Sequence, residues 1–298
     1  FLREGDVFSA VARSPDEITN ILFSSGTTGD PKALPWTHIH PIKCGADAHY
    51  HQDVHPGDVV AWPTNLGWMM GPWLIYAAFL NRATMALYYG APTQWGFGKF
   101  IRDAEVSMLG VIPSMVRTWR GSGCVEGIDF SAIRAFSATG ECSNAEDMHY
   151  LMALSGYRPI LEYCGGTELA GGYLLSTLVK PVAPSTFNSA TLGTDLVILD
   201  EAGEVCDSGE VFLLPPAIGM SSQVLNRDHH EVYYEGVPGL HGVQLRRHGD
   251  QVERLSPGRY RVHGRADDTM NLGGIKVSSA EIERVVNGVD GVVETAAI

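Results

Sequence analysis

Short apolar runs alternate with longer amphipathic stretches over the first two-thirds of the chain. Strands are expected at residues 18–23 (a buried strand), 58–62, 83–88, 106–112, 133–137 and 159–162. Helices are expected at residues 38–51, 73–80, 97–104, 114–119 and 145–155, the last of them capped by Asn144 with Asp147 three positions on. This strand–helix alternation predicts an α/β fold whose parallel sheet is covered on both faces.

The pattern changes after about residue 190. Residues 196–200 and 210–214 predict antiparallel strands, and residues 260–262 predict another. A helix is expected at residues 281–286 and a strand at residues 292–298. We therefore divide the chain into an α/β part (1–190), a β-rich part (191–264) and the beginning of a further α+β part (265–298).

The composition of the chain argues against several classes of protein. The 298 residues carry 34 acidic and 21 basic side chains, and a net charge of −13 with no basic stripe argues against a nucleic-acid partner. The five cysteines are odd in number and form no CxxC pair, which favours a reducing compartment over a disulfide framework. The most apolar run, residues 69–80, is too short to span a bilayer, and no signal peptide is visible at the first residues.

The first chemical signal is a hydroxyl- and glycine-rich loop, residues 23–32 (FSSGTTGDPK), directly after a predicted strand. Glycines let backbone N–H groups converge on an anion, hydroxyls add donors, and a lysine adds positive charge. Ala33 follows the lysine, so the loop is no Walker A motif. The candidate phosphate ligands are Ser24, Ser25, Gly26, Thr27, Thr28, Gly29 and Lys32. A flexible surface turn is the alternative.

Two further strand ends carry polar side chains, residues 138–142 (ATGEC) and residues 162–168 (EYCGGTE). Mg²⁺ prefers a carboxylate together with phosphate oxygens and water, which makes Glu168 a candidate magnesium ligand. Taken alone, Glu168 is equally an ordinary solvated carboxylate, and a strand–glycine–helix turn such as residues 138–142 is commonplace.

These three segments, in this order, resemble the motifs of the adenylate-forming superfamily, which holds acyl-CoA synthetases, firefly luciferase and peptide-synthetase adenylation domains. The branch most similar is that of acetyl-CoA synthetase-like and peroxisomal acyl-activating enzymes. The resemblance implies that Thr167 touches the α-phosphate, Glu168 holds Mg²⁺ and Glu162 accepts from the adenine amino group. Further nucleotide contacts are implied for Gly140, Glu141, Cys142, Tyr163, Cys164, Gly165 and Gly166. Cys164 replaces the usual aromatic residue, so Tyr163 is the alternative for stacking on adenine.

Two later segments extend the resemblance. Residues 247–250 (RHGD) resemble a Thr-Gly-Asp motif whose aspartate, here Asp250, accepts from the ribose hydroxyls; His248 replaces the threonine, and a plain hairpin turn is the alternative. Residues 264–268 and 273–276 resemble the hinge and the start of the mobile C-terminal domain, or else a salt-bridged surface run. The implied roles are ribose and phosphate contact for Arg265, the hinge for Asp267, and phosphate contact for Lys276.

An acyl pocket is implied by residues 62–71, which are similar to the acid-binding segment of acetyl-CoA synthetase-like members. Trp68, Met69 and Met70 would line it, and ordinary core packing is the less favoured alternative for the two methionines. Members that take small acids close this pocket with an indole at the position of Gly165, so we expect an acid larger than acetate.

Histidines 38, 40, 49, 51 and 55 lie close together in the sequence. A zinc site needs well-spaced ligands and usually a cysteine or carboxylate, which makes metal binding by this group the less favoured interpretation.

The resemblance implies a carboxylic acid:CoA ligase that uses ATP and Mg²⁺, with Thr167, Glu168 and Lys32 as catalytic residues. The alternatives are an adenylation module that loads a carrier protein, and a nucleotide-binding relative with little activity. In family terms, the three parts are a large AMP-binding domain, a β-rich subdomain before the hinge and the start of the mobile domain. We expect a fragment that lacks the first part of the large domain and a late catalytic lysine. The expected location is the cytoplasm, or a peroxisome in a eukaryote, and the sequence does not indicate an oligomeric state.

Overall fold

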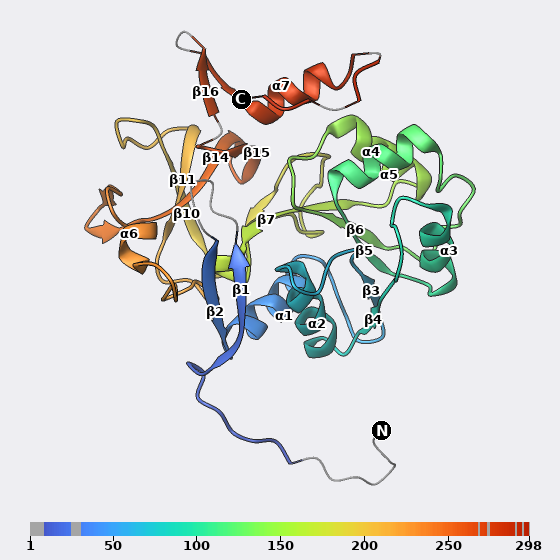
Figure 1. Ribbon diagram of the computed structural model, residues 1–298, viewed down its shortest axis with the longest axis horizontal. Helices are drawn as coiled ribbons and strands as arrows, with labels where there is room; N and C mark the ends of the chain where they lie inside the picture. The colour runs from blue at the N-terminus through green and yellow to red at the C-terminus, as the bar shows by residue number, and fades with distance from the viewer. Residues whose placement is uncertain are drawn as a thin grey trace.

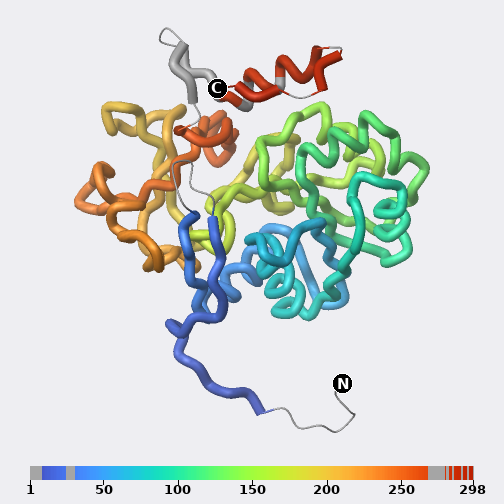
Figure 2. Tube along the Cα trace, in the orientation of Figure 1, coloured from blue at the N-terminus to red at the C-terminus, as the bar shows by residue number. Residues whose placement is uncertain are grey.

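The computed structural model describes residues 9–24, 31–267, 269–272, 275–289, 291–293 and 295–297. Two sheets lie side by side, with the N-terminal segment running out below them and a short C-terminal unit above them (Figures 1 and 2). Within the described residues, none of the helices combines the length and apolarity needed to cross a bilayer.

The larger sheet has seven strands in the order β4-β3-β5-β6-β7-β8-β9. Their bounds are β3 Val59–Ala61, β4 Thr84–Ala86, β5 Met108–Val111, β6 Ala135–Ala138, β7 Ile160–Gly166, β8 Gly171–Leu175 and β9 Ser189–Ala190. The first five strands in this order pair in parallel, as predicted, whereas β8 and β9 pair antiparallel. The predicted parallel sheet is therefore confirmed, and it is extended by an antiparallel edge, because β7 returns directly into β8 without a crossover helix.

Helices cover both faces of this sheet (Figure 1). One face carries α3 Trp95–Asp103, α4 Pro113–Ser122 and α5 Ala145–Leu154, and the other carries α1 His40–Tyr50 and α2 Met70–Leu80. Each layer has its own apolar core, centred on Trp119 and Phe136 in the first and on Trp36 and Trp73 in the second. Every helix and strand predicted between residues 38 and 162 is confirmed, with ends that differ by up to four residues.

Local chemistry explains several of these helix ends. Pro41 falls in the first turn of α1, where its missing N–H costs no hydrogen bond. The Asn144 side chain accepts from the backbone N–H of Glu146, which confirms the predicted cap of α5. Asp147 does not complete a capping box, because its buried carboxylate pairs with Arg120 at 3.0 Å instead.

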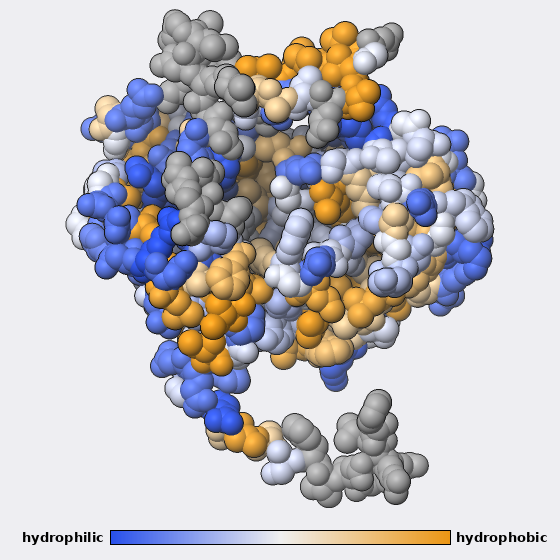
Figure 3. All heavy atoms as spheres, viewed as in Figure 1, coloured by the Kyte–Doolittle hydropathy of each residue, from blue (hydrophilic) through white to orange (hydrophobic). Residues whose placement is uncertain are grey.

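The predicted strand at residues 18–23 is present as β1 Ile18–Ser24, but its expected burial is wrong. It forms an antiparallel hairpin with β2 Lys32–Thr37, separate from the large sheet. Leu22 is buried, whereas Ile18, Ile21 and Phe23 are exposed. Hydrophobic side chains accordingly reach the surface in the lower part of the molecule, where this hairpin lies (Figure 3).

The second sheet is wholly antiparallel, in the order β10-β11-β14-β15. Its strands are β10 Asp195–Leu199, β11 Ser208–Leu214, β14 Arg246–Ser256 and β15 Arg259–Arg265. The three strands predicted at residues 196–200, 210–214 and 260–262 are confirmed, while the longest, β14, was not predicted. Between β11 and β14 lie the short helix α6 His229–Tyr233 and a hairpin of β12 Gly239–Leu240 and β13 Val243–Gln244.

The last segment contains the hairpin β16 Thr269–Leu272 and β17 Ile275–Ser278, followed by α7 Ser279–Val286. The helix confirms the prediction at residues 281–286. A strand at residues 292–298 is absent from the described part of this range, so that prediction is wrong there. The division at residues 190 and 264 stays a proposal; it coincides with the ends of β9 and β15 to within one residue.

Candidate active site

Glu168 lies in a 3₁₀ turn, Thr167–Leu169, that directly follows β7. Its side chain is 11% exposed, and one carboxylate oxygen lies 3.4 Å from Nδ1 of His248. Burial by itself would raise the pKa of Glu168, but the charges of His248, Lys32 and Arg246 outweigh burial and lower it. The carboxylate is therefore ionised near neutral pH, the form that binds a cation.

The glycines before this turn allow it to form. A Cβ at Gly165 would collide with the carbonyl oxygen of Gly171 on β8, and one at Gly166 would meet the Glu168 carboxylate at 2.7 Å. The Thr167 carbonyl accepts from the indole N–H of Trp36 at 2.8 Å, which ties the turn to β2. The backbone of this turn is therefore held by close contacts with β2 and β8.

Asp250 on β14 is buried at the centre of a polar network. It accepts from the Tyr173 hydroxyl at 2.8 Å and from Nη1 of Arg265 at 3.1 Å, and it lies 3.3 Å from Nε2 of His248. Burial favours the neutral acid, but these neighbours outweigh burial and lower the pKa of Asp250 to about 2. His248 therefore lies between two ionised carboxylates, those of Glu168 and Asp250.

Arg265 faces Asp250 across the β14–β15 pair and also donates to the carbonyl of His248 at 2.8 Å. Its Nε lies 3.4 Å from Asp267, the predicted hinge residue, which lies between β15 and β16. Gly249 makes room for this guanidinium: φ is +89° there, and a Cβ would meet Nη2 of Arg265 at 2.5 Å. Glu168, Asp250 and Arg265, which were predicted from the sequence, therefore lie close together in one cluster.

Lys32 begins β2 and pairs with Ser24 across the hairpin. Burial lowers the pKa of Lys32; Glu168 opposes this shift, and the nearby arginines, including Arg265 and Arg246, reinforce it. The Ser24 hydroxyl is buried and has no hydrogen-bond partner among the described residues. Ser25, Gly26, Thr27, Thr28 and Gly29 lie outside the described residues, as does the side chain of Lys276 on β17.

Glu162 is buried on β7 and accepts from the Ser143 hydroxyl at 2.7 Å and the Ser185 N–H at 3.1 Å. Burial raises its pKa to about 7 in spite of these two donors. Gly140, with φ of +95°, and Cys142 belong to the adjacent segment after β6. Glu141 is exposed there and holds the start of α4 by accepting from the backbone N–H and hydroxyl of Ser114.

The raised pKa of Glu162 predicts that the stability of the fold depends on pH. Its folded pKa lies above the usual value of 4.5, so the folded state binds the proton more tightly and loses stability as the pH rises from about 4.5 to about 7. Relative to Glu162→Gln, the wild type should lose at most about 3 kcal/mol of unfolding free energy over this range. Denaturant titrations at pH 5 and pH 8 measure the change. The exposed control Glu204→Gln should give a pH-independent difference, and the same behaviour in Glu162→Gln would contradict the assignment.

The prediction that Tyr163 stacks on adenine is wrong for this structure. Its ring is 3% exposed and packs edge-on against Trp62 and Trp73 in the core between the sheet and the helices α1 and α2. Cys164, the next residue, points the other way, and its thiol lies 3.4 Å from both the Tyr173 hydroxyl and Asp250. Burial raises the pKa of the Cys164 thiol, which is neutral beside that carboxylate.

The predicted acyl-pocket residues lie at the start of α2. Trp68 is 70% exposed, whereas Met69 and Met70 are partly buried against the core that holds Trp73. These contacts fit the packing alternative for the two methionines. Gly165 lies at the end of β7, beside the backbone of β8.

The five neighbouring histidines do not gather around one point. Three examples are His40 beside Thr37, His51 beside the Leu192 N–H, and His49 edge-on to His55. Among the described residues, no group of three or more His, Cys, Asp or Glu side chains could hold a metal ion by itself. Single-carboxylate coordination at Glu168, completed by phosphate oxygens and water, is compatible with this finding.

Three buried side chains of the site were not predicted from the sequence: Tyr173, Tyr233 and Arg246. They lie on β8, α6 and β14; Arg246 directly precedes the motif at residues 247–250 but is not part of it. The one available signal was alternation, because Arg246 lies two residues before His248 and four before Asp250, on the same face of the strand.

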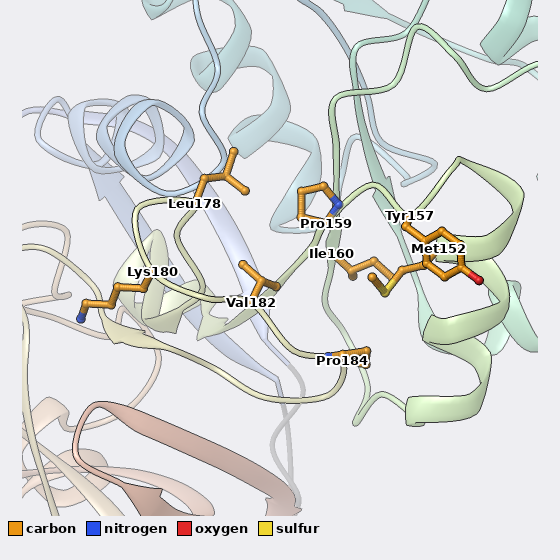
Figure 4. Close-up of a pocket in the computed structure, with 8 residues that line it drawn as sticks. All are labelled: Met152, Tyr157, Pro159, Ile160, Leu178, Lys180, Val182 and Pro184. Atoms are coloured by element: carbon orange, nitrogen blue, oxygen red, sulfur yellow. The ribbon is translucent and has the colours of Figure 1, made fainter.

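A cavity of about 310 Å³ lies elsewhere, between the amino end of β7 and the loop after β8 (Figure 4). Its lining is largely apolar and contains none of the predicted site residues; it consists of Met152, Tyr157, Pro159, Ile160, Leu178, Lys180, Val182 and Pro184. Glu168 follows the opposite end of β7, so this cavity is separate from the candidate active site.

Known proteins resemble this chain over nearly its whole length. It is 55% identical over 300 residues to the probable acyl-activating enzyme 17, peroxisomal, of Arabidopsis thaliana, covering 99% of this chain and 42% of that protein. It is 52% identical to the hexanoyl-CoA synthase of Cannabis sativa, covering 98% of this chain and 41% of that protein. The chain thus spans less than half the length of these relatives.

Solved structures also resemble this chain. The acetoacetyl-CoA synthetase from Streptomyces lividans superposes with a TM-score of 0.81 at 28% identity, covering 92% of this chain and 44% of that one. The family model described as AMP-binding enzyme matches residues 4–218, well over half of the chain. With its mixed α/β sheet and the cluster of Glu168, Asp250 and Arg265, the chain belongs to the AMP-binding enzyme family.

Proposed function

We propose that a polypeptide containing this chain activates a carboxylic acid with ATP as acyl-AMP, releases pyrophosphate, and transfers the acyl group to CoA. The observation that carries the proposal is the convergence of an ionised buried carboxylate, Glu168, with Lys32 and the Asp250–Arg265 pair. The relatives named acyl-activating enzyme and CoA synthase support the same reaction.

The first step joins a carboxylate oxygen of the acid to the α-phosphorus of ATP, and the bond from that phosphorus to the pyrophosphate oxygen breaks. An ionised acid needs no general base, so the barrier consists of charge repulsion and positioning. Lys32 and Arg265 would offset the phosphate charge, the Thr167 hydroxyl would donate to the α-phosphate, and Asp250 would accept from the ribose. In the second step, the CoA thiol attacks the acyl carbonyl and AMP leaves with the bonding electrons.

Mg²⁺ fits the residues present. Glu168 would hold it, because its carboxylate is ionised and Mg²⁺ prefers one or two carboxylates with substrate phosphates. The bound ion would neutralise developing charge on the phosphate oxygens. Asp250 is the second carboxylate nearby, but it is engaged by Tyr173 and Arg265.

We propose an acid larger than acetate. Gly165 puts no side chain where small-acid members of the family carry an indole, and each additional methylene in a pocket contributes only about 1–3 kcal/mol of discrimination. The relative named hexanoyl-CoA synthase makes hexanoate the first acid to test. Trp68, Met69 and Met70 stay proposed as pocket residues.

Acid-dependent pyrophosphate release tests the proposal, with a polypeptide that carries this chain at the full length of its relatives. The assay traps acyl-AMP with hydroxylamine and compares hexanoate with acetate, other medium-chain acids and aryl acids. We expect release with hexanoate and formation of the CoA thioester when CoA is added. ATP binding without release on any acid would instead favour a nucleotide-binding relative, and transfer only to a carrier protein would favour the carrier-loading alternative.

Replacing Lys32 with alanine should weaken the reaction moderately. One charge-assisted contact contributes roughly 1.5–3 kcal/mol, so the KM for ATP should rise about 10- to 100-fold. Steady-state kinetics with varied ATP measures the effect, and the exposed Lys99→Ala, whose partner is Asp103, is the matched control. An unchanged KM and kcat would remove Lys32 from the site.

The cellular location of the protein can be proposed only from the names of its relatives. We propose a peroxisomal location, because the relative from Arabidopsis carries that word in its name. Fluorescence microscopy of the tagged full-length protein tests it, and an even cytoplasmic signal would favour the alternative.

A further inference from the structure

Arg246 is a buried cation that its own chain leaves incompletely satisfied. The residue is 1% exposed, and its Nη2 donates to the Ser221 hydroxyl at 2.7 Å. Its Nε and Nη1 donate to no partner among the described residues. A guanidinium carries five donors in a planar fork, and burying them unpaired is unfavourable. Such a side chain is the expected residue at a site completed by a ligand with several acceptor oxygens.

The surroundings of Arg246 carry excess positive charge. Its guanidinium lies 3.9 Å from the centre of the Tyr233 ring, and Nζ of Lys32 lies 5.2 Å from the same ring. Arg265 and Arg227 are close enough to lower the pKa of Lys32 further, although burial is the larger cause. Glu168 is the carboxylate whose charge acts on Lys32 and on Arg246, whereas Arg265 also faces Asp250 and Asp267. Lys32 and Arg246 together carry more positive charge than Glu168 offsets, which favours an anionic ligand.

The order of side chains along β14 indicates which part of a nucleotide would reach Arg246. Arg246, His248 and Asp250 are buried in this order along β14, through an irregularity in its pairing with β11, and the charges of Arg246 and His248 both act on Glu168. Asp250 stands at the proposed ribose position, and His248 contacts Glu168 at the proposed α-phosphate and magnesium position. Arg246 comes before His248 on the strand, and it lies with Lys32 near the Tyr233 ring.

Resting on the proposed function, we propose that Arg246, with Lys32, binds the two outer phosphates of ATP and the pyrophosphate they form on leaving. The Tyr233 ring lies near both cations, and Arg246 is 1% exposed in the described structure, so neighbouring side chains must shift for the ligand to reach Nε and Nη1. The site acts on the leaving group, whereas Asp250 and Arg265 act on the AMP portion.

Calorimetric titration of a polypeptide that carries this chain at the full length of its relatives, with inorganic pyrophosphate and separately with AMP, tests the proposal. Arg246→Met keeps side-chain volume and removes the charge and the donors. Pyrophosphate affinity should fall about 10- to 100-fold, with AMP affinity unchanged. Arg246→Lys, which keeps the charge but loses the fork, should retain an intermediate pyrophosphate affinity.

Arg247→Met is the matched control. This neighbour points to the opposite side of β14, is 46% exposed in its side chain and pairs with Glu210 at 3.0 Å, so neither affinity should change. Thermal unfolding verifies that each variant is folded, and Arg246→Lys carries the test if Arg246→Met is not. Wild-type pyrophosphate affinity in the folded Arg246 variants, or equal losses for pyrophosphate and AMP, would overturn the inference. If the wild-type chain binds neither AMP nor pyrophosphate, the proposed nucleotide site itself fails.

Discussion

Replacing Glu168 with glutamine is expected to lower acid-dependent pyrophosphate release at least about 100-fold while the protein stays folded. The carboxylate is the proposed magnesium ligand, and losing even the outer partner of a metal ligand typically costs 10–100-fold. Glutamine keeps the shape and the acceptor oxygen but not the charge that Mg²⁺ and the phosphates require. The measurement is the release rate at saturating acid, together with calorimetric binding of Mg²⁺ and ATP.

Glu146→Gln provides the control for the loss of one carboxylate. Glu146 is exposed in the first turn of α5 and pairs with Arg120 at 3.2 Å. Its variant should retain wild-type release. Wild-type rates in Glu168→Gln at limiting magnesium would refute the proposed metal role, and a variant that no longer unfolds cooperatively would indicate a structural role instead.

Replacing Asp250 with asparagine is expected to lower both stability and nucleotide affinity. Removing one partner of a buried charge network leaves its other members uncompensated, at a cost of about 3–5 kcal/mol. Here the uncompensated groups are His248 and Arg265, which Asp250 contacts at 3.3 and 3.1 Å. AMP affinity should fall too, because the amide cannot accept from the ribose hydroxyls with the strength of a carboxylate.

The lowered pKa of Asp250 determines how its contribution to stability depends on pH. The pKa of Asp250 is lowered in the fold to about 2, so its contribution is complete above pH 4 and is lost as the pH falls from about 4 towards 2. The pKa difference accounts for about 2 kcal/mol of that contribution. Denaturant titrations should therefore show a wild-type advantage over Asp250→Asn that is constant between pH 7 and pH 5 and narrows below pH 4.

Asp267→Asn is the comparison for this effect. Asp267 also faces Arg265, but its side chain is 41% exposed, so solvent screens the pair and the stability change should be within about 1 kcal/mol. Equal destabilisation by the two variants would contradict the buried-network assignment of Asp250.

The larger sheet was predictable because its strands carry their own signal. Buried parallel strands read as continuous apolar runs, as at β5 Met108–Val111, and each is followed by a helix with an apolar face. The hairpin β1–β2 shows the limit of the same signal. The apolar residues Ile21 and Phe23 predict a strand, but whether such a strand is covered depends on what packs against it.

Strand β14 was missed because its buried face carries residues of the candidate active site. A half-buried strand is recognised by apolar residues at every second position, but here those positions hold Arg246, His248 and Asp250 before Val252 resumes the pattern. Polar residues occupy a buried face because they satisfy one another and a ligand, which a single-chain pattern cannot indicate. The strand signal thus disappears where the function lies.

The sequence by itself determined the local parts of the site. The turn at Thr167 and Glu168, the glycine that precedes Asp250 on β14 and the order of the motifs depend on neighbouring residues, whose spacing fixes which groups follow one another along the chain. Only the tertiary structure decided that Tyr163 packs in the core and Tyr173 faces Asp250, and that Lys32 and Arg246 flank one tyrosine ring. The physical reason is that these contacts join strands of three separate sheets, and packing between sheets, not sequence spacing, sets which side chains meet.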